Sequence, residues 1–333
     1  AALRTPAHEL PPASATRREL DGTMTASTGA PVIGTRGSPL ALAQARQVQG
    51  LLAAALGCPA EEIALSVIKT TGDMIQDRAL SEAGGKGLFT KELDNALLDG
   101  RIALAVHSAK DLPTVLPDGL VIAGYLPRED VRDVLICRGD ARSIAELPHG
   151  AVVGSASLRR QAQVRRLRPD ISVTLLRGNV GTRLAKVESG EIDATLLALA
   201  GLRRLRLADR ATVLLDTDDF LPAIGQGAIA IVTRAGDVAL RETLRRFTDP
   251  ATAVALEAER AFLRVLDGSC RTPIAGLAQV DGASLSFRGM LLAPDGSDWV
   301  AVERSGPIAD AFALGEDAGR EVRARARPAL LGR

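Results

Sequence analysis

The sequence predicts an α/β protein with two doubly wound units and a small α+β unit at its C-terminal end. Short apolar runs alternate with helical patterns over residues 31–126, and the same rhythm repeats from Pro127 onward. The tail instead shows one long helical pattern, followed by strand-like runs that Asp-Gly pairs join. We therefore expect a disordered leader over 1–30, domain 1 over 31–126 and 221–248, domain 2 over 127–220, and domain 3 over 249–333.

The first unit begins with a strand and a long helix. An apolar run at 32–35 predicts the strand, and Ser38 followed by Pro39 is a good N-cap for a helix over 39–56. Alternating residues over 63–68 predict a second strand.

A glycine-rich segment separates these elements from the rest of the first unit. Residues 81–87 hold three glycines and predict a mobile loop or lid that carries Lys86. A helix over 88–98 then ends at Gly100. The continuously apolar run 102–106 is typical of a strand covered on both faces.

The second unit and the tail complete the predicted fold. Strands are expected over 151–154, 171–176 and 194–200, and helices over 157–167 and 180–188. An apolar segment at 220–233 returns to domain 1. The tail has a helix over 251–266, strands near 276–281, 284–293 and 298–304, and a last helix from about residue 308.

Composition excludes several classes of protein. Hydrophobic residues make up 46% and charged residues 24%, and the net charge of +1 argues against a generally basic nucleic-acid binder. No run of about 18 apolar residues could span a membrane, and the first thirty residues lack the apolar core of a secretory signal. The three cysteines, Cys58, Cys137 and Cys270, are too widely spaced for a zinc site or a disulfide framework. We expect a cytoplasmic protein without a metal.

Polar side chains gather where the predicted strands end, which is where open α/β sheets bind ligands. In chain order they are Arg36, Ser38, His107, Ser108, Lys110, Asp111, Ser155, Ser157, Arg159, Arg160, Arg177, Asn179, Arg183, Arg203 and Arg204. Ten arginines but a single lysine lie between residues 159 and 206. Because a guanidinium binds a carboxylate or phosphate through two parallel hydrogen bonds, these residues predict a cleft for a polyanion. We expect Arg165, Arg166, Arg168 and Arg206 to be solvated surface charge instead.

The ligand is better described as a multi-carboxylate than as a nucleotide or nucleic acid. The chain has no phosphate-binding P-loop, and its eight aromatic residues are too few for base-stacking platforms. Asp111 is the exception in this positive setting, and it is suited to stabilising a cation formed during reaction or to relaying a proton. A simple salt bridge is the alternative for Asp111. His107 follows a buried strand, and we expect a hydrogen-bonded structural residue there.

Cys270 lies in a Gly/Ser/Pro turn between the tail helix and the first tail strand. A thiol in such a turn is accessible, whereas a structural cysteine usually packs as a small hydrophobe. Cys270 is therefore a candidate for covalent chemistry, although this segment by itself favours an ordinary loop cysteine.

Six motifs, in order along residues 32–330, resemble the porphobilinogen deaminase (hydroxymethylbilane synthase) family. They begin at Gly34 (GTRGSPLA), His107 (HSAKDLP), Gly154 (GSASLRRQ), Arg177 (RGNVGTR), Leu221 (LPAIGQGA) and Asp267 (DGSCRTPI). The resemblance implies two periplasmic-binding-protein-like domains plus a third domain with the cysteine loop. It also implies a monomer that joins four porphobilinogen molecules head to tail, with release of ammonia, to give hydroxymethylbilane for tetrapyrrole biosynthesis.

The same resemblance implies roles for individual residues. Cys270 would hold a dipyrromethane cofactor through a thioether, Asp111 would assist the chemistry, and Lys86 would belong to a lid. Residues that would bind acetate and propionate groups are Arg36, Ser38, Lys110, Ser155, Ser157, Arg159, Arg160, Arg177, Arg183 and Arg204. Two alternatives remain at this point: a two-lobed binding protein for a dicarboxylate, which would leave Cys270 without a purpose, and a thiol hydrolase, which would need a base near Cys270.

Overall fold

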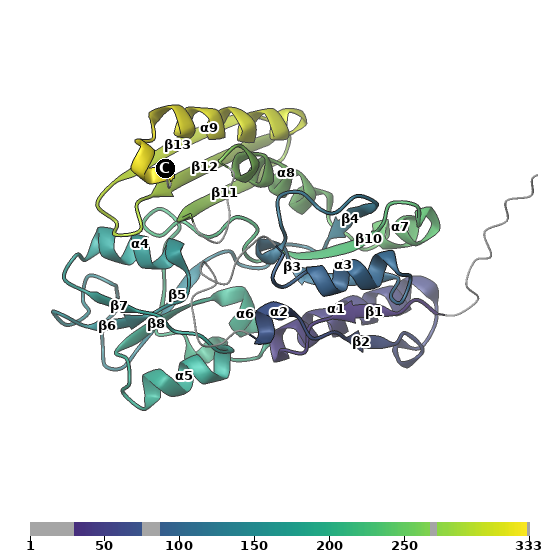
Figure 1. The fold of residues 1–333 in the computed structure, drawn as a ribbon, viewed down its shortest axis with the longest axis horizontal. Coiled ribbons are helices and arrows are strands. Elements are labelled where there is room, and N and C mark those ends of the chain that lie inside the picture. Colours follow the sequence, from purple (N-terminus) through teal and green to yellow (C-terminus); the bar gives the residue numbers. More distant parts are fainter. Residues whose placement is uncertain (1–29, 75–86, 267–271, 332–333) are drawn as a thin grey trace, which may run out of the picture.

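The computed structural model describes residues 30–74, 87–266 and 272–331. Cys270, Lys86 and almost all of the predicted leader and lid lie outside these ranges. The described residues form three sheets, each with its own helices, and the three parts meet near the middle of the molecule (Figure 1). The fold class predicted from the sequence is confirmed, while the residue limits of the domains stay a prediction.

The first sheet has the strand order β2-β1-β3-β10-β4. Its strands are β1 (Ile33–Thr35), β2 (Leu65–Val67), β3 (Leu104–Ser108), β4 (Leu120–Tyr125) and β10 (Ile229–Arg234), and its helices are α1 (Pro39–Leu56), α2 (Thr71–Met74), α3 (Lys91–Leu98) and α7 (Val238–Arg245). Leu104 and Val106 pack with α1 and α7, whereas Ala105 packs with α3 on the other face. The strand β3 is therefore covered on both faces, as its apolar run predicts.

The second sheet has the order β7-β6-β8-β5-β9. Its strands are β5 (Asp133–Cys137), β6 (Val152–Gly154), β7 (Ser172–Thr174), β8 (Ala194–Ala198) and β9 (Val213–Leu214), and its helices are α4 (Leu158–Leu167), α5 (Val180–Glu188) and α6 (Leu199–Arg204). Val164 of α4 packs on one face of this sheet, and Leu184 of α5 and Leu202 of α6 pack on the other.

Both sheets are mixed, although the alternating pattern favours parallel strands. β10 runs antiparallel to β3 and β4, and β5 runs antiparallel to β8 and β9. The reason lies in the path of the chain, which leaves the first sheet through β4, builds the second sheet, and returns as β10. Two antiparallel neighbours do not need the helical crossover that joins two adjacent parallel strands.

The third sheet is an antiparallel meander of β11 (Ile274–Asp281), β12 (Ser284–Leu292) and β13 (Trp299–Pro307). The helices α8 (Pro250–Val265) and α9 (Ala311–Arg325) pack on it, and the rings of Phe262 and Phe287 lie 5.0 Å apart between helix and sheet. Both Asp-Gly pairs form the predicted hairpin turns, with Gly282 and Gly296 at positive φ.

Three of the arginines expected to be surface charge have structural contacts instead. Arg165 donates to the carbonyl of Pro294, and Arg166 lies over the ring of Trp299, so both link α4 to the third sheet. Arg168 binds both carboxylate oxygens of Asp170 and donates to neighbouring carbonyls. Only Arg206 is exposed as predicted. For Arg165 and Arg166 the prediction failed because their long side chains reach partners that are distant in sequence.

Candidate active site

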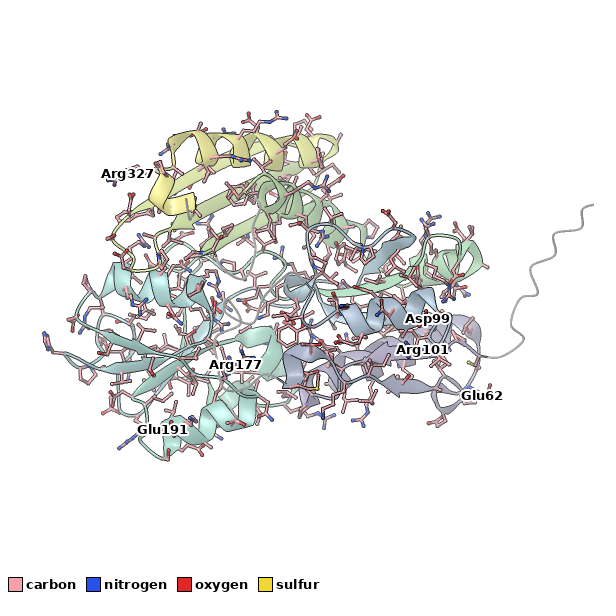
Figure 2. All side chains as sticks on the ribbon, in the orientation of Figure 1. Glu62, Asp99, Arg101, Arg177, Glu191 and Arg327 are labelled. Atoms are coloured by element: carbon pink, nitrogen blue, oxygen red, sulfur yellow. The ribbon has the colours of Figure 1, made fainter. Side chains whose placement is uncertain are left out.

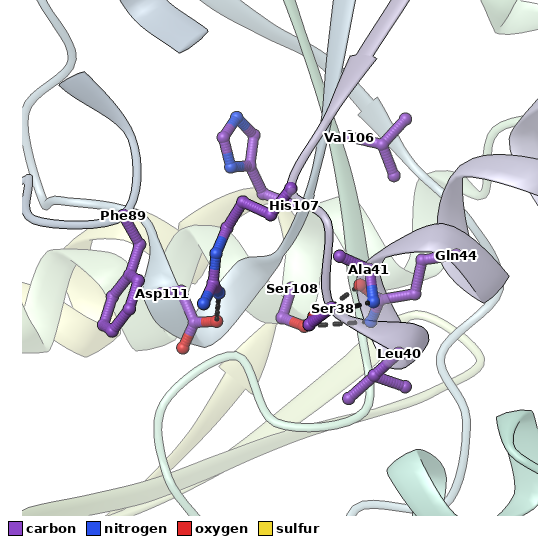
Figure 3. Close-up of a pocket in the computed structure, with 10 residues that line it drawn as sticks. Ser38, Leu40, Ala41, Gln44, Phe89, Val106, His107, Ser108 and Asp111 are labelled. Atoms are coloured by element: carbon purple, nitrogen blue, oxygen red, sulfur yellow. Dashed lines mark hydrogen bonds and ion pairs between the residues drawn. The ribbon is translucent and has the colours of Figure 1, made fainter. Parts of the chain in front are cut away.

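A small cavity opens where β1 and β3 end side by side. It has a volume of about 50 Å³, and its polar lining includes Arg36, Ser38, Gln44, Ser108 and Asp111. In the view of Figure 3, the carboxylate of Asp111 lies between the ring of Phe89 and the hydroxyl of Ser108. The predicted polar residues of the first unit therefore do converge at the carboxyl ends of two parallel strands.

Arg36 connects the groups of this cavity. Its Nε lies 3.2 Å from each carboxylate oxygen of Asp73, its guanidinium carbon lies 4.2 Å from the centre of the Phe89 ring, and its Nη1 lies 3.9 Å from Asp111 Oδ2. Burial acts to raise the pKa of Asp73, but hydrogen bonds from Arg36 and Thr70 outweigh burial and hold that pKa below its usual value.

Three predicted serines are fixed by backbone hydrogen bonds. Ser38 Oγ accepts from Ala41 N at the start of α1, and Ser157 Oγ accepts from Arg160 N at the start of α4. Ser155 Oγ accepts from Ser157 N. In each of these bonds the hydroxyl is the acceptor, so its own hydrogen remains to be donated to a ligand.

Arg159 and Arg160 lie on the first turn of α4 and are almost fully buried, with 5% and 6% exposure. Both pair with Asp133, which is completely buried: Arg159 Nη1 lies 2.8 Å from Oδ2, and Arg160 Nη2 lies 2.7 Å from Oδ1. Burial acts to raise the pKa of Asp133, but the charges of the two arginines outweigh it and hold the pKa far below its usual value.

Lys110 connects this second cluster to the first. Its Nζ donates to Gln226 Oε1 at 3.4 Å, and Gln226 Nε2 donates to Asp133 Oδ1 at 3.0 Å. The surrounding protein atoms and the charge of Arg160 lower the pKa of Lys110 to about 8, although Asp111 and Asp133 act to raise it. The residue is exposed overall, so a ligand can still reach it.

The remaining predicted arginines surround the same centre. Crowding by protein atoms and the charges of Arg160 and Arg177 lower the pKa of Arg183 to about 10. Figure 2 shows Arg177 toward the middle of the molecule, whereas Glu191 lies at its outer edge. Arg204 Nη2 donates to the carbonyl of Gly227, next to Gln226 in the chain. A dense group of cations in one place is a strong site for carboxylates.

His107 differs from its prediction. It is buried, and its Nε2 has no hydrogen-bond partner, whereas a hydrogen-bonded residue was expected. Burial, followed by the charge of Arg36, lowers the pKa of His107 to about 4, so the ring is neutral near pH 7. Within the described residues no group of His, Cys, Asp and Glu could hold a metal ion, and no helix is long and apolar enough to cross a membrane.

Comparison with known proteins identifies the family. Residues 32–242 match "Porphobilinogen deaminase, dipyromethane cofactor binding domain", and residues 253–324 match "Porphobilinogen deaminase, C-terminal domain". The chain belongs to the porphobilinogen deaminase family. Porphobilinogen deaminase of Nitrobacter winogradskyi is 58% identical over 88% of this chain and 93% of its own length, and that of Nitrobacter hamburgensis is 57% identical over the same shares.

The family assignment gives the activity: porphobilinogen deaminases make hydroxymethylbilane with a dipyrromethane cofactor. Among solved structures, the periplasmic aliphatic sulphonate binding protein SsuA of Escherichia coli is 17% identical, with 72% of this chain and 70% of that chain covered. The TM-score of this match is 0.39.

The described side chains fit a cofactor with several carboxylates. The cluster offers guanidinium, ammonium and hydroxyl donors, and the Nε of Arg159 is buried without a partner. Such a set suits carboxylate groups better than a neutral or cationic molecule. Cys270, the predicted attachment point, lies outside the described residues.

Sequence reasoning missed the residues that neutralise this cluster, above all Asp133 and Gln226. Asp133 is the first residue of β5 and Gln226 lies just before β10, and both strands run antiparallel to their neighbours. In an all-parallel sheet, residues before a strand would lie at the far edge. Here Asp133 pairs with Ala198 at the end of β8, and Ile229 pairs with Ser108 at the end of β3. The reversed strands thus place both residues at the site.

Proposed function

We propose that the cations and hydroxyls of this cleft bind the carboxylates of the dipyrromethane cofactor and of porphobilinogen, while Asp111 serves the chemistry. The binding residues are Arg36, Ser38, Lys110, Ser155, Ser157, Arg159, Arg160, Arg177, Arg183 and Arg204. When bound through Cys270, the cofactor supplies the pyrrole carbon at which the chain is extended. Lys86 belongs to a lid over the cleft.

The accessibility of Asp111 carries this proposal. Asp73 binds Arg36 through several hydrogen bonds, and Asp133 is buried between two arginines. Asp111, in contrast, is 3.9 Å from Arg36, and 34% of its side chain is exposed. Of these three carboxylates, it is the most exposed and the least engaged by Arg36 or other arginines, and its charge can stabilise a developing cation or accept a proton.

A test is the isosteric variant Asp111→Asn. We expect turnover to fall by about a hundredfold to ten-thousandfold, which is the usual contribution of a general acid or base. The thermal midpoint should change little, because Asp111 is exposed and makes no close ion pair. Asp118→Asn is the control, since Asp118 is also exposed and lies in the same connection between β3 and β4. Turnover within threefold of wild type would remove Asp111 from the mechanism.

We further propose that the protein works as a monomer in the cytoplasm on free porphobilinogen, which the family resemblance alone supports. Light scattering coupled to size exclusion, with and without porphobilinogen, would test the oligomeric state. A stable dimer in both conditions would contradict it.

A further inference from the structure

We infer that Asp133 is a positioning residue, which holds Arg159, Arg160 and, through Gln226, Lys110 in the arrangement that binds carboxylates. This inference rests on the binding roles proposed above. Asp133 is itself completely buried and cannot touch a ligand. It therefore acts through the side chains that surround it.

The two carboxylate oxygens of Asp133 have different partners. Oδ1 accepts from Arg160 Nε at 3.0 Å, Arg160 Nη2 at 2.7 Å and Gln226 Nε2 at 3.0 Å. Arg160 is also tied to the carbonyl of Leu196 through Nη1. These bonds fix the plane of the Arg160 guanidinium, and they fix the amide that receives Lys110.

Arg159 is held less completely. Its Nη1 donates to the carbonyl of Leu221 and lies 2.8 Å from Asp133 Oδ2, but that contact is not aligned as a hydrogen bond. Both Asp133 Oδ2 and Arg159 Nε are buried without a hydrogen-bond partner. Unused buried donors and acceptors are costly. Arg159 is thus the least completely hydrogen-bonded member of the cluster.

Charge explains why a carboxylate is needed here. Arg159 and Arg160 are almost fully buried, and burial of such cations without a counterion is unfavourable. Crowding by protein atoms and the charge of Arg160 lower the pKa of Lys110 nearby. Asp133 and, beside Lys110, Asp111 are two carboxylates against these three cations, which leaves a net positive charge for the ligand. Asp133 also keeps the cations from spreading apart when no ligand is present.

The primary test is Asp133→Asn, which keeps the shape and removes the charge. Apo-protein would be incubated with increasing porphobilinogen, and the fraction that carries the covalent cofactor would be measured by intact mass. We expect the half-loading concentration to rise at least tenfold. Asp130→Asn is the control, because Asp130 lies three residues away and pairs with Arg132 and Arg203 rather than with Arg159 or Arg160.

A second measurement, the titration of Lys110, does not require the cofactor to be attached. The chain has only five lysines, so ¹³C-dimethylated lysine signals can be resolved by NMR and assigned by Lys→Arg variants. In Asp133→Asn, the titration midpoint of Lys110 should fall, because an anion that raises it is gone. Lys186, which pairs with Glu191 on the surface, should titrate as before.

A folded Asp133→Asn protein with half-loading within twofold and an unshifted Lys110 would overturn the inference. If that variant does not fold, Gln226→Met decides, since it cuts the link to Lys110 and leaves the Asp133–arginine pairs in place. An unchanged Lys110 titration in Gln226→Met would then refute the link from Asp133 through Gln226 to Lys110. The binding proposal fails separately, if replacing Arg159 and Arg160 together by Leu leaves loading unaltered.

Discussion

At the scale of single residues, Cys270 gives the most direct prediction. Cys270→Ser should yield a folded protein without the covalent cofactor, because a serine hydroxyl stays protonated at neutral pH and is a much poorer nucleophile than a cysteine thiolate. Denatured intact mass would show the unmodified chain. Cys137→Ser is the control, since the Cys137 thiol is half-buried and donates to the carbonyl of Ala141. A dipyrromethane-sized excess on Cys270→Ser would refute the anchor.

Lys110 gives a pH dependence at the same scale. With a pKa lowered to about 8, Lys110 is charged below that pH and loses its charge as the pH rises through it. The KM for porphobilinogen should therefore rise on the alkaline side. Lys110→Arg keeps its charge throughout, so its KM should rise less steeply even if its absolute value is worse. Parallel KM profiles for the two proteins would show that another group titrates.

At the scale of elements, the hairpin between β12 and β13 docks on α4. A Cβ at Gly296 would lie 2.5 Å from Arg166 N and 2.6 Å from the Ala162 carbonyl, and Gly296 has φ of 75°. Gly296→Ala should cost more than about 2 kcal/mol of stability. Gly282→Ala is the matched control, because Gly282 also has positive φ but open space around it. Equal losses in urea unfolding would show that backbone strain alone is responsible.

Elements also show what a sequence can and cannot predict. The helix α1 has the predicted bounds, because Ser38 and Pro39 specify its start and Gly57 ends it in the left-handed conformation. The strands β4 and β5 were missed, since β4 contains Gly124 and β5 directly follows a charged run. The predicted polar residues did converge. Their counterions Asp133 and Asp73 could not be recognised in the sequence, because each pairs with an arginine that is distant in the chain and is brought close only by the folded sheets.

At the scale of the whole molecule, Glu259 of α8 joins the three parts. It is completely buried, pairs with Arg128, and accepts from the backbone N–H groups of Gly225 and Ala278. Glu259→Gln would leave Arg128 without its counterion, at a cost of about 3–5 kcal/mol. The thermal midpoint should fall by roughly 5–10 °C. The control is Glu257→Gln on the exposed side of the same helix, and equal midpoints would refute the joint role.

The position of β10 between β3 and β4 has a consequence for synthesis of the protein. β4 pairs only with β10 among the described strands, and about 100 residues separate them in the chain. At about 5–20 residues per second, a ribosome needs roughly 5–20 seconds to make that interval. During this time the facing edges of β3 and β4 stay open on the nascent chain. Such edges attract other strands, so the first sheet should depend on chaperones until its last strand emerges.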